Sequence, residues 1–152
     1  MVRNERVLVN FVTHLECAYT GERYDAGKVH GLSAAGKPII VRYDLAAIAK
    51  AISKDELATR TEGFWRYREF LPVAHAENRI SLGEVVTPLM RMPISEKRMG
   101  VSGEIIVKDE GRLPTGSFKA RGLCVAVSMA KELGLNHLAM PTNGNAGAAM
   151  AA

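Results

Sequence analysis

Apolar residues are spaced differently in the two halves of the chain. In the first half the apolar runs are short. Residues 6–12 (RVLVNFV) and 38–43 (PIIVRY) are rich in β-branched and aromatic residues, so each predicts a strand. The stretch between them contains several glycines and is expected to be rich in turns: Gly21, Gly27, Gly31 and Gly36. Residues 1–80 are therefore expected to be irregular, with short elements.

Helix-start signals follow the second of these runs. Asp44 precedes LAAIAKAI and is suited to cap a helix there. Ser53 and Glu56 have the spacing of a capping box, which predicts a second short helix. Residues 64–72 (FWRYREFLP) predict another short helix or turn that ends at Pro72.

The second half has the pattern of a βαβ unit. Residues 104–108 (EIIVK) form a short continuous apolar run, which predicts a strand covered on both faces. Residues 117–133 predict a helix, and Gly134 follows where a left-handed residue would end it. Residues 137–141 (HLAMP) predict the next buried strand, and a second helix is expected near Asn145.

The helix at 117–133 is expected to bury one side and expose the other. The buried stripe would be formed by Phe118, Gly122, Val125, Ala126, Met129 and Leu133. The polar side would be formed by Arg121, Ser128, Lys131 and Glu132.

A right-handed crossover between two parallel strands determines where the loops of such a unit lie. Loops 109–117 and 141–146 would both lie at the carboxyl edge of the sheet, where open α/β sheets bind ligands. The pattern therefore predicts an α/β fold in which the two loops face one crevice.

Lys119 stands in the first turn of the expected helix, near the positive end of the helix dipole. That position disfavours the ammonium form, and a neutral lysine amine is the form that attacks an aldehyde. Thr115 and Ser117 supply hydroxyls beside it, and Gly116 allows close approach to the backbone. Across the crevice, residues 141–147 (PTNGNAG) offer amides and helix-start N–H groups that suit a carboxylate or phosphate.

Each signal also has an ordinary interpretation. A lone helix lysine is usually solvated, and a TNGN loop is usually a turn with a helix cap. The two signals at the same end of one βαβ unit favour a ligand site.

The composition excludes several classes of protein. The 152 residues are 47% hydrophobic and 24% charged, as in an ordinary globular protein. The net charge of +4 is dispersed, without a basic run of the kind that binds nucleic acid. Two cysteines, Cys17 and Cys124, are too few for a disulfide framework. No apolar run is long enough to span a bilayer, and the first residues do not form a signal peptide, so we expect a cytoplasmic protein.

The motifs resemble those of a known enzyme family. KDEGRLPTGSFKARG (residues 108–122) and PTNGNAG (residues 141–147) resemble the cofactor-lysine and asparagine-loop motifs of fold-type II pyridoxal-phosphate-dependent enzymes. GSFKARG is shared by threonine synthases and by threonine or serine dehydratases. Upstream, IIVRYDL, WRYREFLP, ENRISLGE and TPL occur in the order seen in threonine synthases with an extended N-terminus. The resemblance covers residues 14–152 and favours the threonine synthases.

The resemblance implies roles for individual residues. Lys119 would bind pyridoxal phosphate covalently and then carry protons, Phe118 would pack beside the cofactor ring, and Asn145 would hydrogen-bond the ring 3′-oxygen. The residues that would cradle the substrate carboxylate are Thr142, Asn143, Gly144 and Ala146. Ser117 and Arg121 are further candidates for phosphate or carboxylate contacts. The implied reaction removes phosphate from O-phospho-L-homoserine and adds water to give L-threonine.

The N-terminal part departs from the family pattern. Many relatives have a zinc ribbon with two cysteine pairs, whereas this chain keeps only Cys17. The positions expected to hold cysteine are occupied by Thr20, Ser33 and Ala35. Because one thiol with His14 and His30 makes a poor four-ligand site, we expect a degenerate, ribbon-like segment without metal.

Two further departures concern the catalytic part. Val85 and Val86 stand where the family has a glycine pair, which removes access to positive φ. The glycine-rich loop for the cofactor phosphate and the contact to the pyridine nitrogen lie downstream of residue 152 in the family. We therefore interpret residues 1–80 as an N-terminal extension and residues 81–152 as the start of the cofactor-binding domain. We expect these 152 residues to be a fragment that is inactive and marginally folded alone, and the resemblance implies a homodimeric parent.

Two other hypotheses stay open at this point. One is a threonine or serine ammonia-lyase of the same fold, which the upstream residues disfavour. The other is a truncated, non-catalytic gene product.

Overall fold

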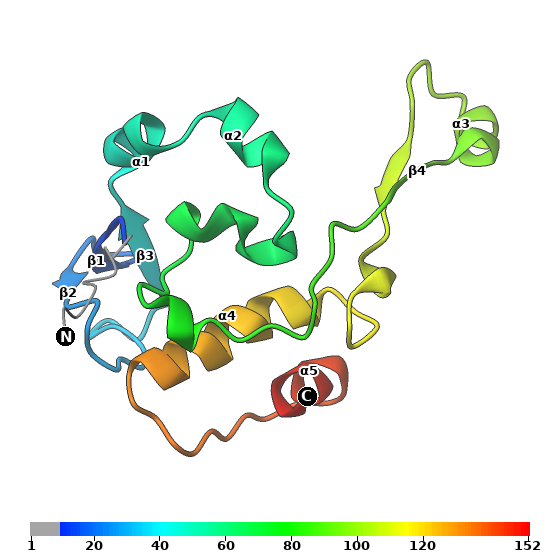
Figure 1. Ribbon diagram of the computed structural model, residues 1–152. Coiled ribbons are helices and arrows are strands. Elements are labelled where there is room, and N and C mark those ends of the chain that lie inside the picture. The colour runs from blue at the N-terminus through cyan, green and yellow to red at the C-terminus, as the bar shows by residue number, and fades with distance from the viewer. Residues whose placement is uncertain (1–9) are drawn as a thin grey trace, which may run out of the picture. The chain divides into compact units, whose positions relative to one another are not determined.

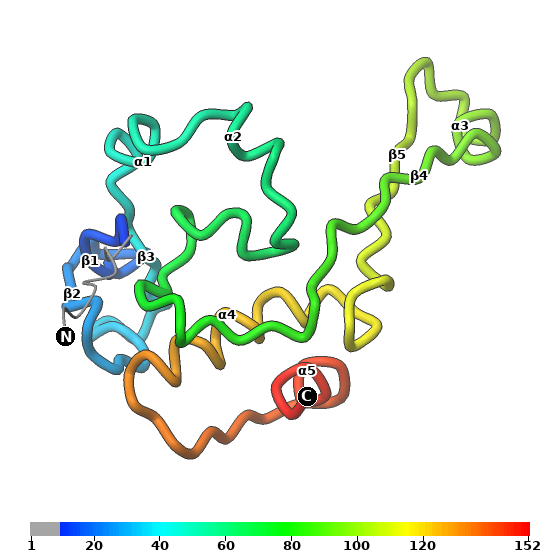
Figure 2. Tube along the Cα trace, viewed as in Figure 1, coloured from blue at the N-terminus to red at the C-terminus, as the bar shows by residue number. Residues whose placement is uncertain are grey.

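The chain divides into two compact units in the computed structural model, which describes residues 10–152. The first unit contains the residues up to Ile80 and Val125–Ala139. The second contains Ser81–Cys124 and Met140–Ala152. Figures 1 and 2 show the course of the chain from blue to red.

A small antiparallel sheet opens the first unit (Figure 1). Strand β1 (Val12–Cys17) is central, with β2 (Arg23–Tyr24) on one side and β3 (Ile39–Tyr43) on the other. The prediction of a strand at residues 38–43 is confirmed by β3.

The strand predicted at residues 6–12 lies mostly outside the described residues. Residues 6–9 lie outside the described residues, and of the others only Val12 belongs to β1. Pairing with β3 decides the position of β1, because Leu15 lies opposite Val41 and Cys17 opposite Ile39. This register places Leu15, Cys17, Ile39 and Val41 on one face of the sheet, with Glu16 and Ile40 on the other.

Two short helices follow β3 and begin at the predicted caps. The Asp44 carboxylate accepts a hydrogen bond of 2.8 Å from a first-turn N–H of α1 (Leu45–Ala51). The Ser53 hydroxyl accepts one of 3.1 Å from Glu56 N at the start of α2 (Lys54–Thr59). Both helix starts are therefore confirmed.

The element predicted at residues 64–72 is a 3₁₀ helix, η1 (Gly63–Phe70). Trp65 on η1 is buried, and its indole N–H donates to the Ile80 carbonyl at 3.0 Å. The indole thereby fixes the end of the segment that follows η1. A second 3₁₀ turn, η2 (Ala76–Asn78), lies within that segment.

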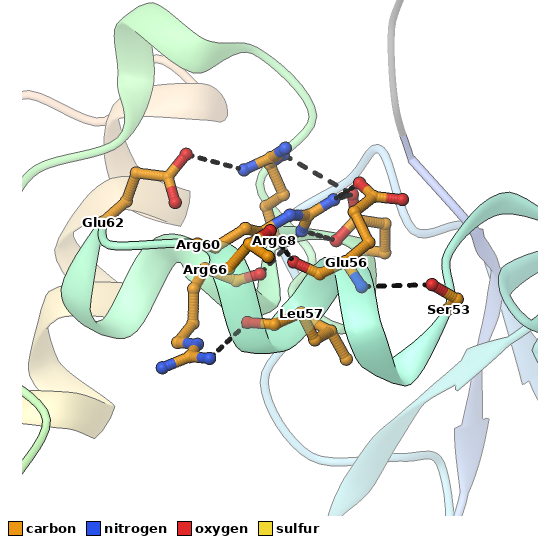
Figure 3. A network of polar contacts seen from close by, with 9 residues as sticks. Ser53, Glu56, Leu57, Arg60, Glu62, Arg66 and Arg68 are labelled. Carbon is orange, nitrogen blue, oxygen red and sulfur yellow. Dashed lines mark hydrogen bonds and ion pairs between the residues drawn. The ribbon is translucent and has the colours of Figure 1, made fainter.

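A buried ion pair links the end of α2 to η1, and Figure 3 shows the polar network around it. The Arg60 guanidinium donates to both Glu69 carboxylate oxygens at 2.7 and 2.9 Å, and the two side chains are 8% and 6% exposed. Burial raises the pKa of Glu69, but the hydrogen bonds and positive charge of Arg60, a backbone hydrogen bond and the nearby charge of Arg68 together leave the pKa below its usual value. Arg60 also donates to Glu56 at 2.7 Å. The bidentate geometry compensates for the loss of hydration of both charges.

The core of the first unit is small. Ile48 of α1, Val73 and Cys17 are fully buried. Ser128 of α4 (Lys119–Glu132) is also fully buried, and its hydroxyl accepts a hydrogen bond of 2.9 Å from Ile80 N. A buried hydroxyl with a backbone partner is satisfied, so a polar residue is stable in this core.

The second unit contains a two-stranded hairpin. Strand β4 (Leu89–Arg91) pairs antiparallel with β5 (Ile106–Lys108), and α3 (Pro93–Met99) stands between them in the chain. The strand predicted at residues 104–108 thus exists in part, as β5. The prediction that both of its faces are covered is wrong, because Ile106 and Val107 are 54% and 40% exposed.

Helix α4 occupies nearly the range predicted for it, but it buries another side. Gly134 adopts a left-handed φ of 70° after the helix, as predicted. The residues of α4 that are buried are Ala120, Cys124, Ser128 and Ala130. Phe118, just before the helix, is 60% exposed, and Gly122 and Ala126 of the predicted stripe are also exposed. Small side chains on one side of α4 allow close packing, and this outweighs the larger apolar residues on the other side.

The strand predicted at residues 137–141 is not formed, and Leu138 there is 44% exposed. A strand requires a neighbour that takes its hydrogen bonds, and the strand pairs of the described residues are all antiparallel and lie elsewhere. The chain thus mixes helices and strands as predicted, but residues 10–152 do not contain the parallel βαβ sheet. Helix α5 (Asn145–Ala151) confirms the helix predicted near Asn145.

No helix among the described residues is long and apolar enough to span a membrane.

Candidate active site

Lys119 is the first residue of α4, as the sequence predicts. Its side chain is half-buried, and Nζ lies 4.4 Å from the centroid of the Phe118 ring. The Phe118 ring is 60% exposed. The structure therefore presents an amine and an open aromatic surface side by side.

The turn before Lys119 is held by short-range contacts. Gly116 has φ of 69° and donates its N–H to the Leu113 carbonyl at 2.8 Å, a conformation that favours glycine. Ser117 is buried, and its hydroxyl accepts a hydrogen bond of 3.4 Å from Lys119 N. The buried Thr115 hydroxyl has no hydrogen-bond partner. A polar group placed against this turn would satisfy that hydroxyl.

A polar cluster joins three segments of the second unit around this turn. The Arg121 guanidinium donates to both oxygens of Glu110 at 2.6 and 3.0 Å and to the Thr87 hydroxyl at 3.3 Å. Glu110, in the 3₁₀ turn η3 (Glu110–Arg112), accepts a further bond of 2.5 Å from Thr87. The cluster thus connects the first turn of α4 with the segments that precede β4 and follow β5.

The cluster fixes the charge state of its acid. Hydrogen bonds from Arg121 and Thr87 lower the pKa of Glu110 to about 2, although burial acts in the opposite direction. Sequence reasoning did not identify Glu110 or Thr87, and it treated Arg121 as a candidate anion contact. In the structure Arg121 braces the start of α4 through Glu110, and its contact with an anion stays a prediction. The available sequence signal for this pair was Glu110, eleven positions before Arg121. Whether the two residues pair depends on how the turn between them folds.

The second predicted loop is a compact turn at the start of α5. Thr142 Oγ1 accepts hydrogen bonds from Gly144 N at 3.2 Å and Gly147 N at 2.9 Å. Gly144, the residue before the helix, has φ of 150°. A Cβ on Gly147 would lie 2.3 Å from Thr142 Cγ2, so the side chain and the helix backbone are in close contact. Asn143 and Asn145 are exposed.

Both segments that the sequence predicts for the site, the start of α4 and the turn before α5, belong to the second unit. The reason is not the predicted one. Ser117, Phe118 and Lys119 lie together at the start of α4, and the residues from Thr142 to Gly147 form the turn of α5. The common edge of a parallel sheet, which was expected to bring them together, is not present among the described residues. The roles of these residues toward a cofactor and substrate remain predictions.

Among the described residues, no cluster of three or more histidine, cysteine, aspartate or glutamate side chains could hold a metal ion. The Cys17 thiol instead hydrogen-bonds the Ser33 hydroxyl at 3.1 Å, and both residues are buried. The bond to Ser33, together with bonds from Thr20, lowers the pKa of the Cys17 thiol to about 7.

Comparison with known proteins shows which family the sequence resembles. Residues 80–152 match the model of a family described as pyridoxal-phosphate dependent enzyme. This segment, just under half of the chain, is similar to that family. Lys119 and the Thr142–Gly147 turn both fall within the matched segment, and the cofactor predicted from the motifs is the family's cofactor.

The similar curated proteins are threonine synthases. The threonine synthase of Methanocaldococcus jannaschii is 39% identical over 136 residues, which are 90% of this chain and 33% of the relative. That of Methanosarcina acetivorans is 35% identical over 91% of this chain and 33% of the relative. That of Halalkalibacterium halodurans is 45% identical over 57% of this chain and 24% of the relative. The chain thus spans no more than about a third of these relatives. No solved structure gave a significant match.

The residues around Lys119 fit pyridoxal phosphate. The cofactor aldehyde needs a lysine amine, and its planar ring needs an apolar surface to pack against. Lys119 and the open face of Phe118 supply these two features within 4.4 Å of each other. The unpartnered hydroxyl of Thr115 lies four residues before the lysine and is available to a polar group of a ligand.

Proposed function

We propose that this chain is part of a threonine synthase, which converts O-phospho-L-homoserine and water to L-threonine and phosphate. The observation that carries the proposal is the position of Lys119, half-buried at the start of α4 beside an open aromatic face, within the segment that matches the family. The curated relatives that align with about nine-tenths of the chain are threonine synthases, which supports this substrate among those of the family.

We assign cofactor binding and proton transfer to separate residues of the chain and to Lys119, which does both. Lys119 Nζ would hold the cofactor aldehyde covalently and, once substrate has replaced it, would accept and return protons. Phe118 would pack against the cofactor ring, and the Asn145 side-chain amide would hydrogen-bond its ring oxygen. Bound pyridoxal phosphate supplies an electron sink for the carbanion chemistry.

A second group of residues orients the substrate. The residues proposed to hold its carboxylate are Thr142, Asn143, Gly144, Ala146 and, from the other segment, Ser117. Because Thr142 Oγ1 already bonds Gly144 N and Gly147 N, the shape of this turn is set before any ligand binds. The Arg121–Glu110 pair acts at a distance from the ligand by fixing the first turn of α4.

The first prediction concerns the lysine. In the full-length protein, Lys119→Ala should abolish the visible absorbance band of lysine-bound pyridoxal phosphate and lower phosphate release by several orders of magnitude, because no other amine occupies that position. Lys97→Ala, on exposed α3, is the matched control and should keep both. Equal loss in both variants, or a band that persists in Lys119→Ala, would contradict the proposal.

The choice of reaction is tested with two substrates. We expect phosphate release from O-phospho-L-homoserine and little ketoacid formation from L-threonine. The reverse result would assign an ammonia-lyase within the same family and would leave the role of Lys119 intact. Absence of both activities in a protein that binds the cofactor would favour a non-catalytic product.

A further inference from the structure

The first unit contains a cavity of about 550 Å³, away from Lys119 in the chain. One side is lined by the sheet through Leu15, Ile39 and Val41, and another by Met129 in α4 and Leu133 just after it. Its volume is that of an ordinary small-molecule site, which is about 300 to 1,000 Å³.

The apolar lining of this cavity is incompletely buried. Leu15 and Val41 are cross-strand partners on the same sheet face, yet both are half-buried, as are Met129 and Leu133 opposite them. Protein interiors are normally packed as densely as organic crystals, so apolar side chains between a sheet and a helix should be fully covered. An apolar ligand body of suitable size would complete this burial.

A carboxylate stands in the lining of the cavity. Glu132 Oε1 accepts a hydrogen bond of 2.7 Å from His75 Nδ1, and Oε2 accepts one of 2.6 Å from Asn78 Nδ2. Burial raises the pKa of Glu132, but these hydrogen bonds outweigh it and leave the pKa below its usual value. Its side chain is 12% exposed, so a negative charge is held at the edge of an apolar space.

Glu132 Oε1 also accepts from Ala74 N at 3.2 Å and His75 N at 3.3 Å, whereas Oε2 keeps acceptor capacity beyond its bond from Asn78. His30 Nε2 donates to the Asp25 carbonyl at 2.8 Å, so Nδ1 of the neutral ring is an acceptor. The Lys28 ammonium lies 3.3 Å from the Asp25 carboxylate, which compensates its charge. The lining therefore offers acceptors and one carboxylate rather than a site for an anion.

We infer that this cavity binds a small amphipathic amine, with its apolar body between the sheet and α4 and its ammonium group toward Glu132. The site is distinct from the proposed catalytic residues and does not depend on the proposed function. A primary ammonium donates three hydrogen bonds, which suits Glu132 Oε2 and the neighbouring imidazole acceptors.

The test uses three probes of similar size and different head group, namely benzylamine, benzyl alcohol and benzoate. Binding to the full-length protein is followed by the methyl resonances of Leu15, Val41 and Leu133. We expect saturable shifts with benzylamine, at least about tenfold weaker binding of benzyl alcohol, and weaker binding still of benzoate. Lys119→Ala should leave these shifts unchanged, which separates this site from the catalytic one.

Two kinds of variant sharpen the test. Val41→Phe fills the cavity and should weaken benzylamine binding about tenfold, whereas Ile40→Phe, on the opposite sheet face, should not. Met129→Phe is a second filling variant if Val41→Phe perturbs the sheet. Glu132→Gln should abolish the preference for benzylamine over benzyl alcohol. Equal binding of all three probes, no methyl shifts, or equal effects of Val41→Phe and Ile40→Phe would overturn the inference.

Discussion

Glu110 joins three segments of the second unit through a single carboxylate. It accepts from Arg121 in α4 and from Thr87 before β4, and Lys108 Nζ lies 3.8 Å from it. The motif around Lys119 shows which residues stand near the amine, but it does not show what holds α4 at its starting angle. That function falls to an ion pair whose partners are eleven residues apart.

The second prediction follows from this pair. Because the folded pKa of Glu110 is about 2, below its ordinary value, its contribution to stability is complete above about pH 4.5 and is lost as the pH falls toward 2. Glu110→Gln should destabilise the protein by about 2 kcal/mol at neutral pH, a value reduced for the partial exposure of the pair. Urea unfolding as a function of pH measures this difference.

The control for this prediction is a substitution at another carboxylate, and the contrary result concerns the pH dependence of Glu110→Gln. Glu104→Gln, at an exposed carboxylate, should change the free energy of unfolding by less than about 0.5 kcal/mol. The difference between wild type and Glu110→Gln should shrink as the pH falls from 5 to 2. A difference that stays constant over this range would show that the charge of Glu110 is not what stabilises the cluster.

Among the elements, those with local signals were predicted well and those that depend on distant partners were not. Asp44 and Ser53 cap their helices because a short side chain reaches backbone N–H groups within the same turn. Residues 137–141 have the composition of a strand but lack a hydrogen-bonding neighbour among the described residues. A cap is a contact between near neighbours in sequence, whereas a strand is defined by another segment.

The third prediction concerns the turn that begins α5. Replacing a helical glycine with alanine usually stabilises a helix by about 0.5 to 1 kcal/mol. Gly147→Ala should do the opposite, because the new Cβ would lie 2.3 Å from Thr142 Cγ2. Faster amide hydrogen exchange in α5 and weaker substrate binding are the expected results.

Rescue by a second substitution tests the cause of this effect. Thr142→Ser removes Cγ2 and keeps the hydroxyl that bonds Gly147 N, so the double variant should recover most of the protection of α5. Gly122→Ala in α4, where no atom lies within 4 Å of the new Cβ, is the control and should not be destabilising. No rescue in the double variant would show that crowding by Thr142 is not the reason.

For the molecule as a whole, the two units differ in how much apolar surface they leave open. In the second unit, Leu89, Ile94 and Met99 are 69%, 70% and 70% exposed. Exposed apolar surface of this extent marks an interaction surface. The chain spans about a third of its curated relatives, so the remainder of a full-length protein is one candidate to cover these residues.

The fourth prediction is made at this scale. Residues 1–152 expressed alone should release no more phosphate from O-phospho-L-homoserine than the same segment with Lys119→Ala. They should also unfold with low cooperativity in urea. The reason is that few apolar side chains of the second unit are buried, so little apolar surface stabilises the start of α4. Turnover at the rate of the full-length protein would contradict this expectation.

The sequence alone determined the lysine at a helix start, the glycine turn before it, the caps of the short helices and the family, because these depend on residues close together in the chain. Tertiary structure decided which side of α4 is buried, which strands pair, and that Arg121 pairs with Glu110. It also created the cavity that Glu132 helps to line, whose lining comes from segments up to about 120 residues apart. Such arrangements depend on which distant surfaces exclude water together, and no local pattern specifies that choice.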